Sequence, residues 1–296
     1  MDYQQFVAVI KEKVAQSLGD GMSLEIRTTL KNNGRERTGL TISQGETNIS
    51  PTIYLEEYYQ QFEKGNSPED IVESLLDVYH EVNFEHTWQI HSIKDFAEIQ
   101  SKIVYKVISA DKNEEFLKAV PVIYYLDLAI VFYILFEVDD SGTATIPITN
   151  ELTELWGTNA RELYEIAKKN SPLLLPATLK SMRVVIEELL GNECESCVLD
   201  DDIMFVLTNQ LRNFGAACIL YGDILEQING QLDENYYILP SSIHEVIIIP
   251  ESQSPDKEQL LEMVAEINET QVDPEEVLSN QVYYYDSNIR ALINTY

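Results

Sequence analysis

The sequence is poor in basic residues, in cysteine and in glycine. Its 296 residues include 20 Lys and Arg against 50 Asp and Glu, which gives a formal net charge of −30. A surface of that sign repels phosphate, so binding of nucleic acid through a basic face is excluded. Three cysteines cannot form a disulfide framework. The 12 glycines form neither a P-loop nor a G-x-G-x-x-G motif, so no cofactor is expected.

The N-terminal segment does not have the pattern of a secretion signal. Residues 3–18 alternate apolar side chains such as Phe6, Ile10 and Val14 with charged ones such as Lys11 and Lys13. This spacing predicts an amphipathic helix rather than a continuous apolar stretch. Because the few thiols have no framework to join, we expect a reducing compartment and hence a cytoplasmic protein.

One apolar stretch has the length of a membrane span. Residues 119–136 are apolar over 18 positions except for Asp127. Pro121 lies near the start, an aspartate lies at the middle, and the Val, Ile, Tyr and Phe content favours a pleated sheet. We therefore expect two buried strands, 120–126 and 129–138, that turn near Asp127, and no membrane association.

Local patterns place the remaining elements along the chain. Alternating segments at 23–30 and 36–43 flank Asn33-Gly34, which is typical of a β-hairpin. Ser67 followed by Pro68 is typical of a helix start. Expected helices are 51–64, 68–85, 93–100, 150–156, 159–169, 178–190, 216–232 and 254–268, with a short one after Asp273-Pro274. Expected further strands are 103–108, 143–147, 203–208, 236–239, 244–249 and 282–285.

Strands in adjacent pairs and helices in runs predict an α+β fold. The sheet should be mostly antiparallel and built from hairpins, with helices packed on it. A polar, acidic connection at 192–202 suggests two sub-domains, an N-terminal α+β region at 1–191 and a C-terminal α+β region at 203–290. A single continuous domain is the alternative.

Three groups of metal-ligand residue types lack the spacing of a known site, so no metal is expected. Acidic neighbours also argue against a redox role for the paired cysteines, because they disfavour the thiolate. The groups are Cys194 with Cys197, His80 with His86 and His91, and Asp200 to Asp202.

The loop between two apolar strands carries the best candidate site. Ser241, Ser242, His244 and Glu245 bring a hydroxyl, an imidazole and a carboxylate into one short span. His244 and Glu245 are adjacent in an expected strand and would point to opposite faces. The interpretations are therefore a structural turn, or a weak catalytic candidate made of Ser241, Ser242 and His244.

Acidity is concentrated towards the C-terminal end. From residue 214 on, 15 acidic residues face two basic ones, Lys257 and Arg290. Charge of that size steers complementary partners. We expect a non-enzymatic binding protein whose acidic, tyrosine-bearing surface meets a basic or mixed-charge protein partner. The alternatives are a hydrolase-like enzyme using the Ser241/Ser242/His244 loop with a carboxylate such as Asp223 or Glu226, and an acidic nucleic-acid mimic.

Several segments together resemble an uncharacterised bacterial family, a domain of unknown function of the gut-anaerobe type. The resemblance covers most of residues 50–290 and is carried by five segments: V-P-V-I-Y-Y-L-D-L-A-I-V-F-Y (120–133), W-G-T-N-A-R-E-L-Y-E-I-A-K-K-N (156–170), L-Y-G-D-I-L (220–225), Y-I-L-P-S-S-I-H-E-V-I (237–247) and V-L-S-N-Q-V-Y-Y-Y-D (277–286). The resemblance implies a soluble protein that acts as one unit. No activity is established for that family, so it assigns no functional residue.

Overall fold

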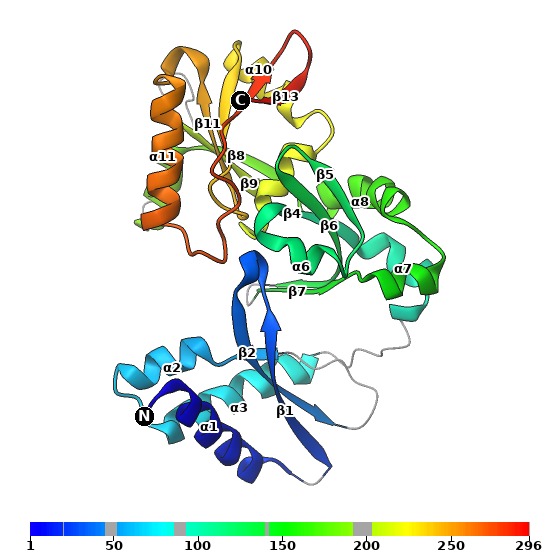
Figure 1. The fold of residues 1–296 in the computed structure, drawn as a ribbon, viewed down its shortest axis with the longest axis vertical. Helices are drawn as coiled ribbons and strands as arrows, with labels where there is room; N and C mark the ends of the chain where they lie inside the picture. The colour runs from blue at the N-terminus through cyan, green and yellow to red at the C-terminus, as the bar shows by residue number, and fades with distance from the viewer. Residues whose placement is uncertain (20, 45–51, 86–92, 140–141, 192–202, 296) are drawn as a thin grey trace. The chain divides into compact units, whose positions relative to one another are not determined.

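A computed structural model describes residues 1–19, 21–44, 52–85, 93–139, 142–191 and 203–295. Within these residues, helices accompany three antiparallel sheets, which confirms the predicted α+β class. The chain divides into two compact units, unit 1 (Met1–Glu98) and unit 2 (Ile99–Tyr296). Figure 1 shows both by their colour along the chain.

The domain boundary expected from the sequence lies at residues 192–202. This segment lies outside the described residues. The strands on either side of that segment, Ala177–Ser181 and Phe205–Asn209, pair with each other in one sheet of unit 2. A sheet ladder thus joins the regions on either side of residues 192–202.

Unit 1 combines a three-stranded sheet in the order β1-β2-β3 with helices. Its elements are α1 (Tyr3–Ser17), β1 (Met22–Leu30), η1 (Asn32–Gly34), β2 (Glu36–Gln44), β3 (Thr52–Tyr54), α2 (Glu56–Glu63) and α3 (Pro68–Glu85). The predicted hairpin is present, because β1 pairs with β2 from Met22 opposite Gln44 to Leu30 opposite Glu36. Its core takes apolar residues from α1, β2 and α3, among them Phe6, Ile10, Leu40, Ile71 and Leu75.

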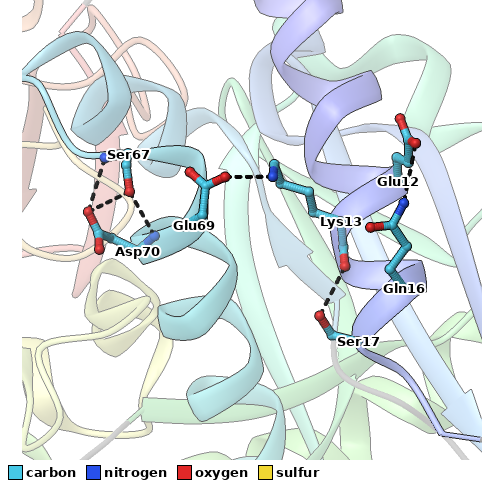
Figure 2. Close-up of polar contacts among 7 residues, drawn as sticks. All are labelled: Glu12, Lys13, Gln16, Ser17, Ser67, Glu69 and Asp70. Atoms are coloured by element: carbon cyan, nitrogen blue, oxygen red, sulfur yellow. Dashed lines mark hydrogen bonds and ion pairs between the residues drawn. The ribbon is translucent and has the colours of Figure 1, made fainter.

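Side-chain caps and an ion pair fix the helices of unit 1 (Figure 2). The Asp70 N–H donates to Ser67 Oγ over 3.1 Å, and Ser67 Oγ donates to the Asp70 carboxylate over 2.7 Å. These contacts confirm the predicted start of α3, since a serine at this position satisfies an orphan backbone donor. Lys13 Nζ lies 2.6 Å from Glu69 Oε1 and so links α1 with α3.

The helix expected at 51–64 is shorter in the structure. Thr52–Tyr54 forms β3, which pairs with β2 through Ile53 opposite Leu40, and α2 begins only at Glu56. The 3–4 residue spacing of Ile53 with later apolar residues misled the prediction, because sheet pairing with a distant strand outweighs local periodicity.

The chain enters unit 2 within α5 (Phe96–Ile99). The elements that follow are η2 (Gln100–Lys102), β4 (Ile103–Ser109), η3 (Asp111–Asn113), α6 (Glu114–Leu117), β5 (Val122–Tyr125), β6 (Leu128–Asp139), β7 (Gly142–Pro147), α7 (Asn150–Trp156), α8 (Ala160–Leu174), β8 (Ala177–Ser181), α9 (Met182–Leu189), β9 (Phe205–Asn209), η4 (Gly215–Leu220), α10 (Ile224–Leu232), β10 (Tyr236–Leu239), β11 (Val246–Pro250), η5 (Glu251–Gln253), α11 (Lys257–Thr270), β12 (Tyr283–Asp286) and β13 (Ala291–Asn294).

The apolar stretch 119–136 forms strands, as predicted. β5 and β6 make a hairpin with Tyr125 opposite Leu128, and β6 also pairs with β4 and β7. Leu126 takes the turn with φ +55°. Within the described part of the chain, no helix combines the length and the apolarity that crossing a bilayer requires.

The second sheet of unit 2 has the order β13-β12-β10-β11-β9-β8. Helix α11 lies along β11 on one face (Figure 1), where Leu260 and Val264 pack on Leu239, Ile249 and Val282. Strand β13, which was not predicted from the sequence, pairs with β12 through Leu292 opposite Tyr285.

Several predicted helices of unit 2 differ from the structure. Residues 274–276 form a turn where a short helix was expected, and α11 begins at Lys257 rather than at 254. The helix expected at 178–190 is β8 followed by α9, with Ser181 capping the helix at Val184 N–H. The helix expected at 216–232 is broken at Gly222 (φ +27°) into η4 and α10. Helix α8 runs past Lys169 to Leu174, and Ser171 Oγ in its last turn accepts a hydrogen bond from the Tyr105 N–H.

Candidate functional site

The predicted candidate loop, residues 240–245, joins β10 to β11 and is held by the chain segment that follows α11. Ser242 bridges Val277, the Leu278 N–H donates to the Ser241 carbonyl, and the Ile243 N–H donates to the Glu276 carbonyl. Ser241 and Ser242 are only 7% and 5% exposed. Both hydroxyls therefore lie inside the fold rather than at a surface that a substrate can reach.

The His244 side chain has a partner at each ring nitrogen. Its Nδ1 accepts a hydrogen bond from the Phe214 N–H over 3.2 Å, and its Nε2 lies 3.3 Å from Glu276 Oε1. Because Nδ1 accepts, a neutral imidazole carries its hydrogen on Nε2 and directs it at the carboxylate. Ser242 Oγ accepts from the His244 backbone N–H over 3.0 Å. The hydrogen bond between serine and histidine therefore involves the backbone and not the ring.

Phe214 connects this histidine to the other sheet of unit 2. Its ring centroid lies 5.4 Å from that of His244, and Lys106 Nζ of β4 lies 3.4 Å from the centre of the Phe214 ring. Phe214 itself has φ +55°, a conformation that costs energy for a bulky residue and persists where surrounding contacts hold it. These contacts assign the His244 ring a positioning role between the two sheets.

The geometry supports a structural turn better than a nucleophilic serine. The carboxylate at the imidazole is Glu276, whereas the sequence analysis named Asp223 or Glu226, and Glu226 instead lies 3.8 Å from Arg290. Strand β11 begins at Val246, two residues later than expected, so His244 and Glu245 belong to the loop. Hydrolysis at Ser241, Ser242 and His244 stays a prediction.

A pocket of about 350 Å³ lies beside this loop, and Glu245 contributes to its wall. Sheet residues form the floor, α9 forms one side, and the lining residues are Thr178, Lys180, Met182, Val185, Leu189, Val206, Thr208, Arg212, Glu245 and Ile247. Burial raises the pKa of the Glu245 carboxyl, while nearby His244 lowers it and Glu276 raises it further. The combination of an apolar cavity with a perturbed carboxyl is typical of ligand sites.

The basic residues of this pocket, Lys180 and Arg212, were not among the predicted site residues. Lys180 and Arg212 belong to only three basic residues between Lys169 and Lys257. Because basic residues are so rare in this part of the sequence, their positions could have been used to predict a binding site. No comparable signal points to Glu276, because its contact with His244 depends on a turn after α11.

The remaining candidates do not form a site within the described residues. There, no group of three or more His, Cys, Asp or Glu residues could hold a metal ion. Cys194, Cys197, His86, His91 and Asp200 to Asp202 lie outside the described residues. The described cysteine, Cys218, is buried, and burial raises the pKa of its thiol to about 12.

The outer face of α11 is acidic. Glu258, Glu262 and Glu266 follow one another at four-residue spacing, Glu269 continues the row, and all four are exposed. Residues three and four apart lie on one face of a helix, so these carboxylates form one row, the α11 acidic row. The opposite face of α11 is buried against the sheet.

Comparison with known families identifies the chain. Residues 3–287 match a family of unknown function (DUF5688), and the chain belongs to that family. This confirms the resemblance to a domain-of-unknown-function family. Neither the curated proteins nor the solved structures include a match to the chain.

Proposed function

We propose that this member of a family without an assigned activity is a cytoplasmic, non-enzymatic binding protein that meets a basic or mixed-charge protein partner through the α11 acidic row. The single observation that supports the proposal is the row itself. Four exposed carboxylates stand on one helix face whose other side is anchored in the sheet. Function at such a surface requires no cofactor and no reacting group.

The negative net charge of the whole chain also favours a basic partner. The sequence from residue 214 on has a formal charge of −13, out of −30 for the entire chain. At 1.5 Å per residue, the row from Glu258 to Glu269 extends over roughly 16 Å. Concentrated charge accelerates encounter with an oppositely charged partner and makes the association dependent on salt.

The experiment compares two triple variants with the same change in charge. Glu258→Gln, Glu262→Gln and Glu266→Gln neutralise the acidic row. Glu151→Gln, Glu154→Gln and Glu165→Gln neutralise exposed carboxylates on α7 and α8 instead. Each protein is titrated with a lysine-rich peptide and used to capture partners from native lysate, at low and at high salt.

We expect the row variant to bind the peptide more weakly and to lose a salt-sensitive partner that the wild type and the α7/α8 variant both retain. If both triple variants bound the peptide equally weakly, the loss would come from net charge alone. That result would contradict a defined binding face on α11. A lysate partner that is lost in neither variant would also contradict the proposal. A mimic of nucleic acid would need two rows of carboxylates, whereas the α11 acidic row is a single row. The row therefore favours a protein partner, and mimicry of nucleic acid stays an untested alternative.

A further inference from the structure

The pocket between α9 and the six-stranded sheet has an apolar body. Val206 of β9 lies opposite Lys180 of β8 and opposite Ile247 of β11, so these three adjacent strands direct side chains to the same face and form the floor. Helix α9 contributes Met182 and Val185 to the wall. Such a lining favours a ligand with an apolar part.

Leu189 shows that this apolar surface is incompletely covered. It lines the pocket, yet it is 74% exposed. Met182, Val185 and Leu189 recur at spacings of three and four, which places them on one face of α9. A ligand between this face and the floor would remove apolar surface from water, which favours binding.

The two cations of the pocket are already engaged by an internal partner. Lys180 Nζ lies 2.6 Å from Glu188 Oε1, and the Arg212 guanidinium pairs with the other oxygen of the same carboxylate. These contacts lower the pKa of Glu188. An anionic ligand would have to compete with Glu188 for both cations.

The carboxyl of Glu245 is in the opposite situation. It lines the cavity and is half-buried, and it has no ion pair among the described residues, its hydrogen-bonding neighbour being the Ser242 hydroxyl. Arg212 of the same pocket pairs with Glu188. Burial raises the pKa of Glu245 more than His244 and Arg212 lower it. The charged form of this carboxyl is therefore penalised, and a positive charge brought by a ligand relieves that penalty. The negative potential of the chain further favours a cation over an anion.

We propose that this pocket binds a primary amine with a compact apolar body, with the ammonium group against the Glu245 carboxylate and the apolar body between Val206 and the α9 residues Met182 and Val185. The volume of about 350 Å³ lies near the small end of ligand pockets and suits a single ring or a short branched chain. This site is separate from the α11 acidic row and does not depend on the protein partner proposed above.

The test uses three probes that share one apolar body and differ in the charge of the head group. Cyclohexylmethylamine, cyclohexylmethanol and cyclohexanecarboxylate are titrated into the full chain at neutral pH by calorimetry and by ligand-observed NMR. We expect the amine to bind roughly tenfold or more tightly than the alcohol, in line with a charge-assisted hydrogen bond, and the carboxylate to show no saturable binding. A carboxylate that binds as tightly as the amine would overturn the proposal, as would a folded wild type that does not bind the amine.

Three variants assign the binding to this pocket. Glu245→Gln should reduce the affinity for the amine to about that for the alcohol. Glu151→Gln, which removes an exposed carboxylate from α7, should leave it unchanged. Val185→Trp should fill the cavity and abolish binding of both the amine and the alcohol, which keeps the test decisive if Glu245→Gln disturbs the loop. Unchanged amine binding in folded Glu245→Gln or in folded Val185→Trp protein would refute the assignment.

Discussion

Asp127 and Tyr283 form a hydrogen bond across 156 residues of sequence: the tyrosine hydroxyl donates to Asp127 Oδ1 over 2.5 Å. The second carboxylate oxygen accepts from Ser279 Oγ, also over 2.5 Å. Asp127 follows Leu126 in the turn of the β5–β6 hairpin, whereas Tyr283 begins β12 of the other sheet. The charged residue that interrupts the apolar stretch therefore joins the two sheets of unit 2.

Replacing either partner of this pair should destabilise unit 2. We expect Asp127→Asn to lower the free energy of unfolding by about 1–3 kcal/mol, because two buried hydroxyl donors lose a charged acceptor. Tyr283→Phe should cost less, about 1 kcal/mol. Urea unfolding of the two single variants and the double variant should give a coupling energy of about 0.5 kcal/mol or more. In a parallel cycle, Tyr284→Phe should show no coupling with Asp127→Asn, since the Tyr284 hydroxyl contacts Glu251 instead.

Gly215 should not tolerate a side chain. A Cβ at this position would lie 2.5 Å from the His244 carbonyl oxygen and 2.6 Å from the Asn209 nitrogen, and backbone atoms cannot move away cheaply. We expect Gly215→Ala to lower the melting temperature and to reduce the free energy of unfolding by about 1–3 kcal/mol.

Gly230 provides the matched control for this substitution. It lies in α10 with open space around its Cα, so Gly230→Ala should raise stability by about 0.5–1 kcal/mol through helix propensity. Thermal unfolding of both variants tests the pair, and a neutral Gly215→Ala would mean that η4 can shift away from the loop.

The Cys218 thiol should be unreactive in the native protein. Burial raises its pKa to about 12, and Sγ donates to the Thr208 carbonyl over 3.3 Å. The thiolate is the reactive form, so little of it is present near pH 8. A variant with Cys194→Ser and Cys197→Ser isolates this cysteine for titration with Ellman's reagent. We expect no rapid colour until denaturant is added, whereas immediate reaction of the folded protein would contradict the described burial.

The raised pKa of Glu245 predicts how the free energy of unfolding changes with pH. Burial raises its pKa in the folded protein above the unfolded value, so the folded state binds the proton more tightly. The free energy of unfolding therefore falls as pH rises from the unfolded to the folded pKa. Glu245→Gln removes this dependence, and its stability relative to the wild type should increase from acidic to neutral pH. Parallel curves of stability against pH for the two proteins would show that the carboxyl is solvated.

Most elements with strong local signals could be predicted from the sequence. The hairpin around Asn33-Gly34, the Ser67 cap and the strands on either side of Asp127 each depend on a few neighbouring residues. Where pairing with a distant strand decides the outcome, local periodicity failed. Residues 52–54 and 178–181 pair with strands elsewhere in the sequence, and both were expected in helices.

The candidate site was predicted only in part, for a similar reason. The loop with Ser242 and His244 could be located, because hydroxyl and imidazole groups gather between two apolar strands. The partners of His244 could not be located, since Phe214 and Glu276 reach it from other parts of the fold. The pocket beside the loop depends on α9 lying over three strands, an arrangement that no local pattern encodes.

The bond between Asp127 and Tyr283 also bears on the order of events during translation. The β5–β6 hairpin leaves the ribosome long before residues 279–283 have been made, so its aspartate must await donors that arrive about 150 residues later. At about 5–20 residues per second, that delay is on the order of ten seconds. During this interval the side chain of Asp127 lacks both of its hydroxyl donors, so this link between the two sheets of unit 2 can form only at the end of synthesis.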